Sequence, residues 1–251
     1  MQLPLTILSQ PTETTCGPTC LHAVYRYYQD TITLDKVISG VKTLESGGTL
    51  AVYLACHALE RGYKATIISF NLQLLDPTWF SIEPVVDIGE KLRLQAKYKS
   101  DSKLRAATDA YLEFLELGGA LEFQDFSPAL FSNCFARGKP VIAGLSATFL
   151  YQCAREIGEN ICDYDDIKGY SSGHFVVLHG YDSIGELVDV ADPLHPNPLS
   201  IKRNYQIGIN RIICAIMLGV LSFDANLLII EKPVSEHAKF DCSQQSEKLD
   251  I

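Results

Sequence analysis

The first strong hydrophobic pattern lies near the N-terminus, where the larger side chains recur every three or four residues. These positions are Leu21, Val24, Tyr25 and Tyr28. Such spacing is typical of the buried face of an amphipathic helix. Pro18 falls in the first turn, where its missing N–H costs no hydrogen bond. The pattern therefore predicts a helix over residues 17–28.

Further along the chain, helix-like and strand-like patterns follow one another. A second helix is predicted over residues 49–60, ended by Gly62 and followed by the strand-like run K-A-T-I-I-S-F. A third helix, over residues 127–137 and capped by Gly138, leads into the strand P-V-I-A-G-L-S. The last predicted elements are the strands F-V-V-L-H-G-Y and E-L-V-D-V-A, an apolar helix, and the strand N-L-L-I-I-E.

The length and composition indicate one domain. A chain of 251 residues with 47% hydrophobic content can bury one substantial core. We assign that domain to residues 1–233. Residues 77–125 have a charged, amphipathic helical character and are interpreted as an inserted region, because a compact core does not need them to close. Residues 234–251 are polar, and we expect a flexible tail there.

Two of the predicted strands can bring a histidine and an aspartate together. His174 precedes F-V-V-L-H-G-Y, and Asp192 ends E-L-V-D-V-A-D. In a hairpin centred on Ser183, His174 stands opposite Asp192. A carboxylate beside a histidine orients the ring and stabilises the imidazolium that forms when the ring takes a proton. A register slip of one residue would separate the pair, and Asp192 before Pro193 also fits a simple turn.

The candidate nucleophile is Cys16, where the first predicted helix begins. Aligned backbone N–H groups and the helix dipole favour a thiolate at such a position. The backbone N–H of Cys16 can donate one hydrogen bond to an oxyanion, and the side-chain amide of Gln10, six residues upstream, can donate a second. The alternative interpretation is that Cys16 is a small buried apolar residue.

The motifs Q-P-T-E-T-T-C-G-P-T-C, G-H-F-V-V-L-H-G-Y and V-A-D-P resemble those of the papain-like cysteine peptidases, in the branch similar to bacteriocin-processing, double-glycine-leader peptidases. The resemblance implies an α+β, papain-like fold, with the Cys on an N-terminal helical part and the His and Asp on an antiparallel sheet. It assigns Cys16 as nucleophile, His174 as base and acid, and Asp192 as orienting carboxylate. It assigns Gln10 as oxyanion donor. The chain departs from relatives at Thr15, where they often carry an acidic residue, and the exporter role of those relatives is not implied.

Charge and composition exclude several function classes. The chain carries 21 Lys and Arg against 30 Asp and Glu, a net charge of −9 that repels a phosphate backbone, so nucleic acid is not an expected partner. No secretory signal is evident, which predicts a cytoplasmic location. The longest apolar run, residues 212–221, is too short to cross a bilayer. The eight cysteines and six histidines show no metal-ligand spacing, so we expect neither metal nor cofactor.

The sequence therefore predicts a thiol-dependent hydrolase that cleaves a peptide or isopeptide bond through a thioester. The alternatives are a papain-fold acyltransferase or amidase that uses the same triad, and a catalytically silent binding module. The expected partner is a peptide or protein substrate. Residues 156–166 are rich in carboxylates and precede His174, which favours substrates with Lys or Arg near the scissile bond. A solvated loop without a partner is the alternative interpretation of this segment.

Overall fold

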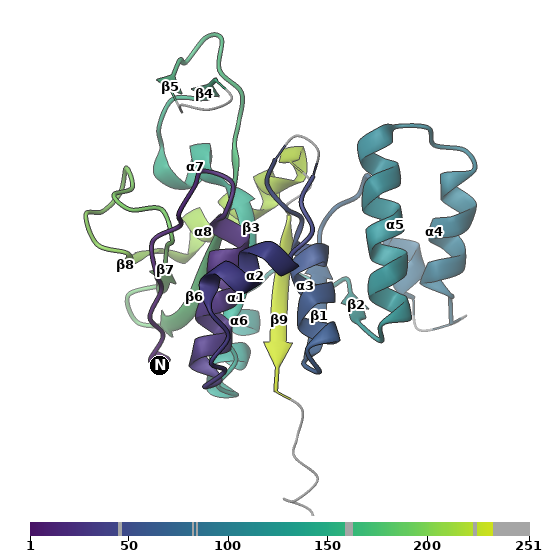
Figure 1. Ribbon diagram of the computed structural model, residues 1–251, viewed down its shortest axis with the longest axis horizontal. Helices are drawn as coiled ribbons and strands as arrows, with labels where there is room; N and C mark the ends of the chain where they lie inside the picture. Colours follow the sequence, from purple (N-terminus) through teal and green to yellow (C-terminus); the bar gives the residue numbers. More distant parts are fainter. Residues whose placement is uncertain (45–46, 82, 84, 159–162, 223–224, 233–251) are drawn as a thin grey trace, which may run out of the picture.

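The computed structural model (Figure 1) describes residues 1–44, 47–81, 83, 85–158, 163–222 and 225–232. The tail predicted for residues 234–251 lies outside the described residues. In chain order the elements are α1 (Cys16–Tyr27), α2 (Leu34–Gly40), α3 (Ala51–Glu60), β1 (Lys64–Ser69), the 3₁₀ helix η1 (Pro77–Phe80), α4 (Ile88–Ala96), α5 (Ser102–Glu116), β2 (Ala120–Glu122), α6 (Pro128–Ala136), β3 (Val141–Ser146), α7 (Ala147–Tyr151), β4 (Glu156–Ile157), β5 (Asp163–Tyr164), β6 (Gly173–Asp182), β7 (Leu187–Ala191), β8 (Asn204–Gly208), α8 (Ile209–Leu218), the 3₁₀ helix η2 (Gly219–Ser222) and β9 (Asn226–Glu231).

A seven-stranded sheet forms the centre of the fold, in the order β2-β1-β9-β3-β6-β7-β8. Neighbouring strands are antiparallel, apart from the parallel pair β1 and β2. The short strands β4 and β5 pair with each other in a separate finger that extends beyond α7 (Figure 1). The predicted α+β class, with helices first and an antiparallel sheet after them, is confirmed.

Helices cover both faces of the sheet, and strand β6 shows why. Phe175 and Val177 point into the core shared with α1 and α3, whereas Val176 and Leu178 point into the core shared with α6, α7 and α8. Alternate residues of a strand face opposite sides of a sheet, so a continuous apolar run marks a strand that is buried on both faces. Burying each such side chain contributes about 1.5–3 kcal/mol. The β6 strand is therefore the rigid centre on which the candidate site is built.

Most of the predicted elements are confirmed, with boundaries shifted by a few residues. The helices predicted over residues 17–28, 49–60 and 127–137 correspond to α1, α3 and α6, and the late apolar helix corresponds to α8. The predicted strands correspond to β1, β3, β6, β7 and β9. Helix α2, helix α7 and strand β8 were not predicted, and the last two of these contribute to the candidate site.

Residues 77–125 form η1, α4, α5 and β2, and α4 and α5 lie to one side of the sheet (Figure 1). Their apolar side chains join the core beneath α1 and α3; Leu92 and Phe114 are fully buried there. Gly118 ends α5 with a φ of +86°, which only glycine adopts without strain. Gly119 then passes so close to the Phe114 ring that a Cβ would lie 2.2 Å from it. The assignment of this region as an insertion stays a prediction.

Candidate active site

Helix α1 is held tightly against the start of β6. The Cys20 thiol donates a hydrogen bond to the Phe175 carbonyl at 3.2 Å. One turn earlier, a Cβ at Gly17 would lie 2.7 Å from the Thr49 methyl group and 3.2 Å from the Phe175 ring. Only glycine allows this approach, which explains why a glycine follows the candidate nucleophile. The packing brings Cys16 beside the strand end that carries His174.

The first turn of α1 is not capped by its own N-cap residue. Thr15 makes no capping bond; its hydroxyl instead donates to the Thr12 carbonyl at 2.9 Å and accepts from the Thr12 N–H at 3.0 Å. The first N–H groups of a helix lack intrahelical acceptors. The N–H of Cys16 is the first of these groups, so it has no intrahelical acceptor, as an oxyanion donor requires.

The hairpin of β6 and β7 carries His174 and Asp192, but the predicted register is wrong. Asp182 pairs with Leu187, so four residues form the turn and it is not centred on Ser183. Nearer the site Leu178 pairs with Val190. This register places Asp192 opposite Val176, and His174 is then its diagonal neighbour on the same face. Long side chains can still meet across a diagonal.

A β-bulge at His179 decides which face Asp192 occupies. The register changes by one residue between Leu178 and Gly180. Without this change Asp192 would stand opposite Val177, whose side chain points into the core beneath α1. The extra residue reverses the parity and returns Asp192 to the face of His174.

The N-terminal segment stabilises the bulge. The N–H of Leu3 donates to the His179 carbonyl at 2.7 Å, and the His179 ring nitrogen Nδ1 bonds the Leu3 carbonyl at 3.0 Å. At Gly180 a Cβ would lie 2.2 Å from an Asp189 carboxylate oxygen. The bulge is thus stabilised by a strand-like contact with the N-terminal residues. It also depends on Gly180, because a side chain at that position would collide with the Asp189 carboxylate.

The structure brings together three of the four predicted site residues. The Nε2 atom of His174 lies 2.9 Å from Oδ1 of Asp192, and both residues are buried. Cys16 lies close enough to the same imidazole to raise its pKa, and Nδ1 is the ring nitrogen that Asp192 leaves open. Burial alone would lower the pKa of His174, but the Asp192 carboxylate and Cys16 raise it well above its ordinary value. This arrangement suits an imidazole that accepts a proton from a thiol.

Two tyrosines that the sequence interpretation missed complete the surroundings of Asp192. The hydroxyls of Tyr151, at the end of α7, and Tyr205, on β8, each donate to Oδ2 of Asp192 at 2.8 Å. The Leu194 N–H donates to Oδ1 at 3.0 Å. Burial would raise the pKa of Asp192, yet His174 and the two tyrosines hold it below its ordinary value. Neither tyrosine belongs to a sequence motif with His174 or Asp192, so the local sequence does not indicate their role.

Removing these hydroxyls should move the acid limb of the pH profile. In Tyr151→Phe and Tyr205→Phe the ring stays but one donor to the carboxylate is lost, so the pKa of Asp192 rises. We expect the acid limb of kcat/KM to shift upward by about one pH unit in each variant, because a bond to a charged group is worth about 1.5–3 kcal/mol. The readout is kcat/KM between pH 4 and 9.

A matched control for this prediction is Tyr98→Phe, because Tyr98 is 88% exposed. Its acid limb should coincide with that of the unsubstituted protein. An acid limb that does not move in the double variant Tyr151→Phe/Tyr205→Phe would show that the hydroxyls serve packing only.

Gln10 lies in the loop before α1, beside the Asp192 side of the site. Its backbone N–H donates to the Pro193 carbonyl at 2.9 Å. Its side-chain Nε2 donates to the Thr12 carbonyl at 3.0 Å and to the Glu13 carbonyl at 3.4 Å, while Oε1 is buried without a partner among the described residues. The oxyanion role of Gln10 stays a prediction. For this role the Gln10 side-chain amide must release the Glu13 carbonyl, which it bonds at 3.4 Å, and donate that hydrogen bond to the oxyanion instead.

The carboxylate-rich segment forms the finger that contains β4 and β5, with Glu159 outside the described residues. Oδ1 of Asp165 accepts the N–H groups of Ile167 and Lys168, both at 2.8 Å, and these bonds lower the pKa of Asp165. The Arg155 guanidinium donates to carbonyls of the same turn. Residues 165–168 therefore form a hydrogen-bonded turn shortly before β6. The predicted preference for cationic substrates stays a prediction.

Comparison with protein families relates this site to known proteins. The model of the Peptidase_C39 like family matches residues 97–212. This stretch of the chain is similar to that family. The matched range contains His174 and Asp192, and Cys16 and Gln10 precede it. The predicted resemblance to papain-like cysteine peptidases is confirmed by this match, and so is the predicted class, a cysteine-peptidase-like hydrolase.

Solved structures similar to this chain have low sequence identity. A protein from Bacillus anthracis described as a C39-like peptidase is 15% identical, with a TM-score of 0.49, over 93% of this chain and 96% of the other. The peptidase domain of Streptococcus ComA, a bifunctional ABC transporter, is 13% identical, with a TM-score of 0.44, over 90% of this chain and 98% of the other. A comparison with curated proteins finds no match.

Within the described residues, no three His, Cys, Asp or Glu side chains gather as a metal site would need. No helix in that same part of the chain has both the length and the hydropathy to span a bilayer.

Proposed function

We propose that the chain is a thiol-dependent hydrolase that cleaves a peptide or isopeptide bond through a thioester. The observation that carries the proposal is the buried His174–Asp192 pair at 2.9 Å, with Cys16, at the start of α1, close enough to the imidazole to raise its pKa. A carboxylate-held imidazole beside a thiol at a helix N-terminus is the arrangement that activates a cysteine nucleophile.

In the proposed reaction His174 takes the thiol proton and the Cys16 sulfur attacks the carbonyl carbon. The oxyanion accepts a hydrogen bond from the Cys16 N–H. It accepts a second one from the Gln10 amide once that amide has released the Glu13 carbonyl. The tetrahedral intermediate collapses to a thioester as the C–N bond breaks, and His174 gives its proton to the leaving amine. Water then attacks the thioester, losing a proton to His174, and the acid product and the thiol are released. Asp192 keeps the imidazole oriented throughout.

The substrate we propose is a peptide or protein. The described carboxylates of the finger, Glu156, Asp163, Asp165 and Asp166, support a cationic residue near the scissile bond, because clustered negative charge attracts such substrates. The acceptor of the acyl group is water in this proposal, and an amine acceptor would make the chain an acyltransferase with the same triad.

One experiment separates these activities. A proteome digest is incubated with the protein and with Cys16→Ala, and both products are analysed by mass spectrometry. New peptide termini that depend on Cys16 indicate hydrolysis, whereas added mass on amine-bearing peptides indicates transfer. Identical spectra for the two proteins would contradict any thiol-dependent activity on peptides.

The nucleophile can also be tested without a substrate. We expect iodoacetamide to label Cys16 faster than Cys20 near pH 6, because His174 can take the proton of Cys16 whereas burial raises the pKa of Cys20. The readout is the labelled fraction of each cysteine by peptide mass spectrometry. Asp192→Asn should reduce the difference. Equal labelling of both cysteines in the unsubstituted protein would remove the basis for Cys16 as nucleophile.

A further inference from the structure

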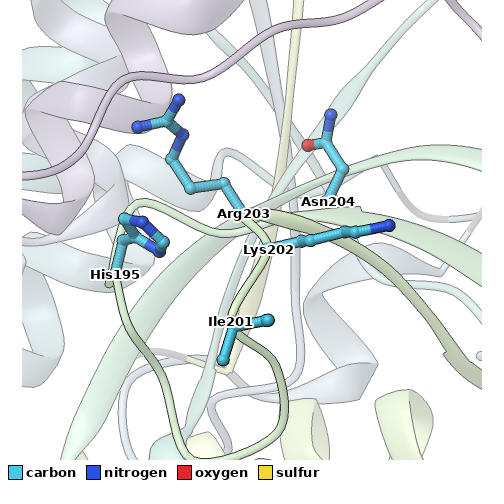
Figure 2. A pocket seen from close by; sticks show the side chains of 5 residues that line it. All are labelled: His195, Ile201, Lys202, Arg203 and Asn204. Carbon is cyan, nitrogen blue, oxygen red and sulfur yellow. The ribbon is translucent and has the colours of Figure 1, made fainter.

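The loop between Asp192 and β8 borders an open surface cavity of about 370 Å³, and the residues that line it are all exposed. Its lining is formed by His195, Ile201, Lys202, Arg203 and Asn204 (Figure 2). His195 lies on the outgoing arm of the loop, and the other four lie on the arm that returns to β8. The loop sequence from Pro193 to Arg203 holds Lys202 and Arg203 and no Asp or Glu. In a chain of net charge −9, this is a local concentration of positive charge.

The cations of this cavity have no carboxylate partner within the described part of the chain. The Lys and Arg residues there that do pair with an acidic side chain are Lys42, Arg61, Arg93 and Lys139. Neither Lys202 nor Arg203 lies within ion-pair distance of a described carboxylate. The Arg203 guanidinium makes one side-chain bond, to the Ser9 hydroxyl at 3.1 Å. Most of its five N–H donors are therefore free for a ligand.

The cavity adjoins the candidate active site through its backbone. The Asp192 N–H donates to the Arg203 carbonyl at 2.8 Å, and the Gln10 N–H donates to the Pro193 carbonyl at 2.9 Å. The Arg203 side chain extends toward the N-terminal segment, where Ser9 precedes Gln10 (Figure 2). A ligand group in the cavity would thus lie beside the residues that flank the candidate active site.

We propose that this cavity binds a carboxylate of the substrate, with Arg203 as the principal contact. The inference rests on the proposed function and extends it to the substrate class. The guanidinium fork matches the two oxygens of a carboxylate, and Ser9 orients it in advance. The Asn204 amide and His195 supply further polar contacts, and Ile201 an apolar one for the methylene groups of a Glu side chain. The carboxylate belongs to an acidic side chain or to the peptide C-terminus.

The test measures binding to the Cys16→Ala protein, so that cleavage plays no part. The probes are acetyl-Ala-Ala-Glu-Ala-Ala-amide, its Gln counterpart, and acetyl-Ala-Ala-Ala-Ala with a free C-terminal carboxylate. Affinity is measured by calorimetry, and the site by NMR shifts of residues 193–204. An exposed charge pair contributes modestly to affinity and a bidentate Arg–carboxylate pair contributes more, so we expect the Glu peptide to bind about 3- to 10-fold more tightly than the Gln peptide.

Adding Arg203→Gln should remove this preference, and adding Arg105→Gln, an exposed arginine on α5, should leave it unchanged. Preference for the free acid over the Glu peptide would identify the C-terminal carboxylate as the ligand group. Equal binding of the Glu and Gln peptides with no response to the free acid would overturn the proposal. The proposal would also be overturned if the preference for the Glu peptide survived Arg203→Gln, or if Arg105→Gln weakened that preference as much as Arg203→Gln does. Failure of the proposed hydrolysis would be seen separately. The products of the proteome digest would then be the same with and without Cys16, while the Glu peptide would still bind more tightly than the Gln peptide.

Discussion

Replacing Cys16 with alanine is expected to abolish peptide cleavage and to preserve the fold. The substitution removes the atom that forms the thioester and leaves the His174–Asp192 pair in place. Loss of a nucleophile costs on the order of 10⁴-fold or more in kcat. Alanine is compatible with the first turn of α1, so the unfolding temperature should stay close to that of the unsubstituted protein. The measurements are kcat on a peptide found in the digest and thermal unfolding.

The matched control for this prediction is Cys20→Ala, one turn further along α1. That substitution removes the bond from the thiol to the Phe175 carbonyl, and it should lower the free energy of unfolding by about 1–2 kcal/mol. Because the nucleophile remains, turnover should persist. Cleavage that survives Cys16→Ala but not Cys20→Ala would move the nucleophile to the second cysteine and refute the proposed assignment.

Asp192→Asn is expected to have the next largest effect, on both turnover and stability. The carboxylate accepts bonds from His174, Leu194, Tyr151 and Tyr205. An amide offers one acceptor oxygen, so its NH₂ group must face donors, and His174 loses the charge that raises its pKa. We expect kcat to fall by about 10² to 10⁴-fold. The free energy of unfolding should fall by about 1–3 kcal/mol, since buried donors lose their acceptors.

Asp189→Asn provides the comparison for Asp192→Asn. Asp189 is also buried on the β6–β7 hairpin, where it accepts a bond from the Gln206 side chain at 3.0 Å. Its loss can lower stability, but it does not contact His174. Kinetic assays and chemical denaturation of both variants separate the two effects. Full turnover in Asp192→Asn would require a different orienting group for the imidazole.

The elements that the sequence predicted are those whose signals are local. The 3- and 4-residue spacing in α1 reflects its contact with one core. Gly62 and Gly138 were predicted to end helices, and both adopt positive φ, at 81° and 68°. The strands that became β3, β6 and β9 are buried on both faces and therefore appear as continuous apolar runs. In each case neighbouring residues alone carry the information.

The features that the sequence did not predict depend on residues far apart in the chain. Tyr151 and Tyr205 reach Asp192 from α7 and β8, two elements without a recognisable pattern of their own. The bulge at His179 depends on the N-terminal segment, which is distant in sequence. Sequence reasoning therefore found the pairing of His174 with Asp192 through a register that the structure does not have. The side-chain bonds of Gln10 within its loop likewise have no sequence signature.

The bulge at His179 gives this architecture a simple way to lose or regain activity during evolution. Insertions at the hairpin tip, between Asp182 and Leu187, leave the paired region near the site unaltered. Loss of the bulge with all residues retained has another consequence. If His179 paired regularly, Asp192 would stand opposite Val177 and its carboxylate would face the apolar layer beneath α1. A homologue without the bulge can therefore keep all four site residues and still lack the pairing of His174 with Asp192. The backbone that permits the bulge, including the close approach at Gly180, is as diagnostic of the site as the four residues themselves.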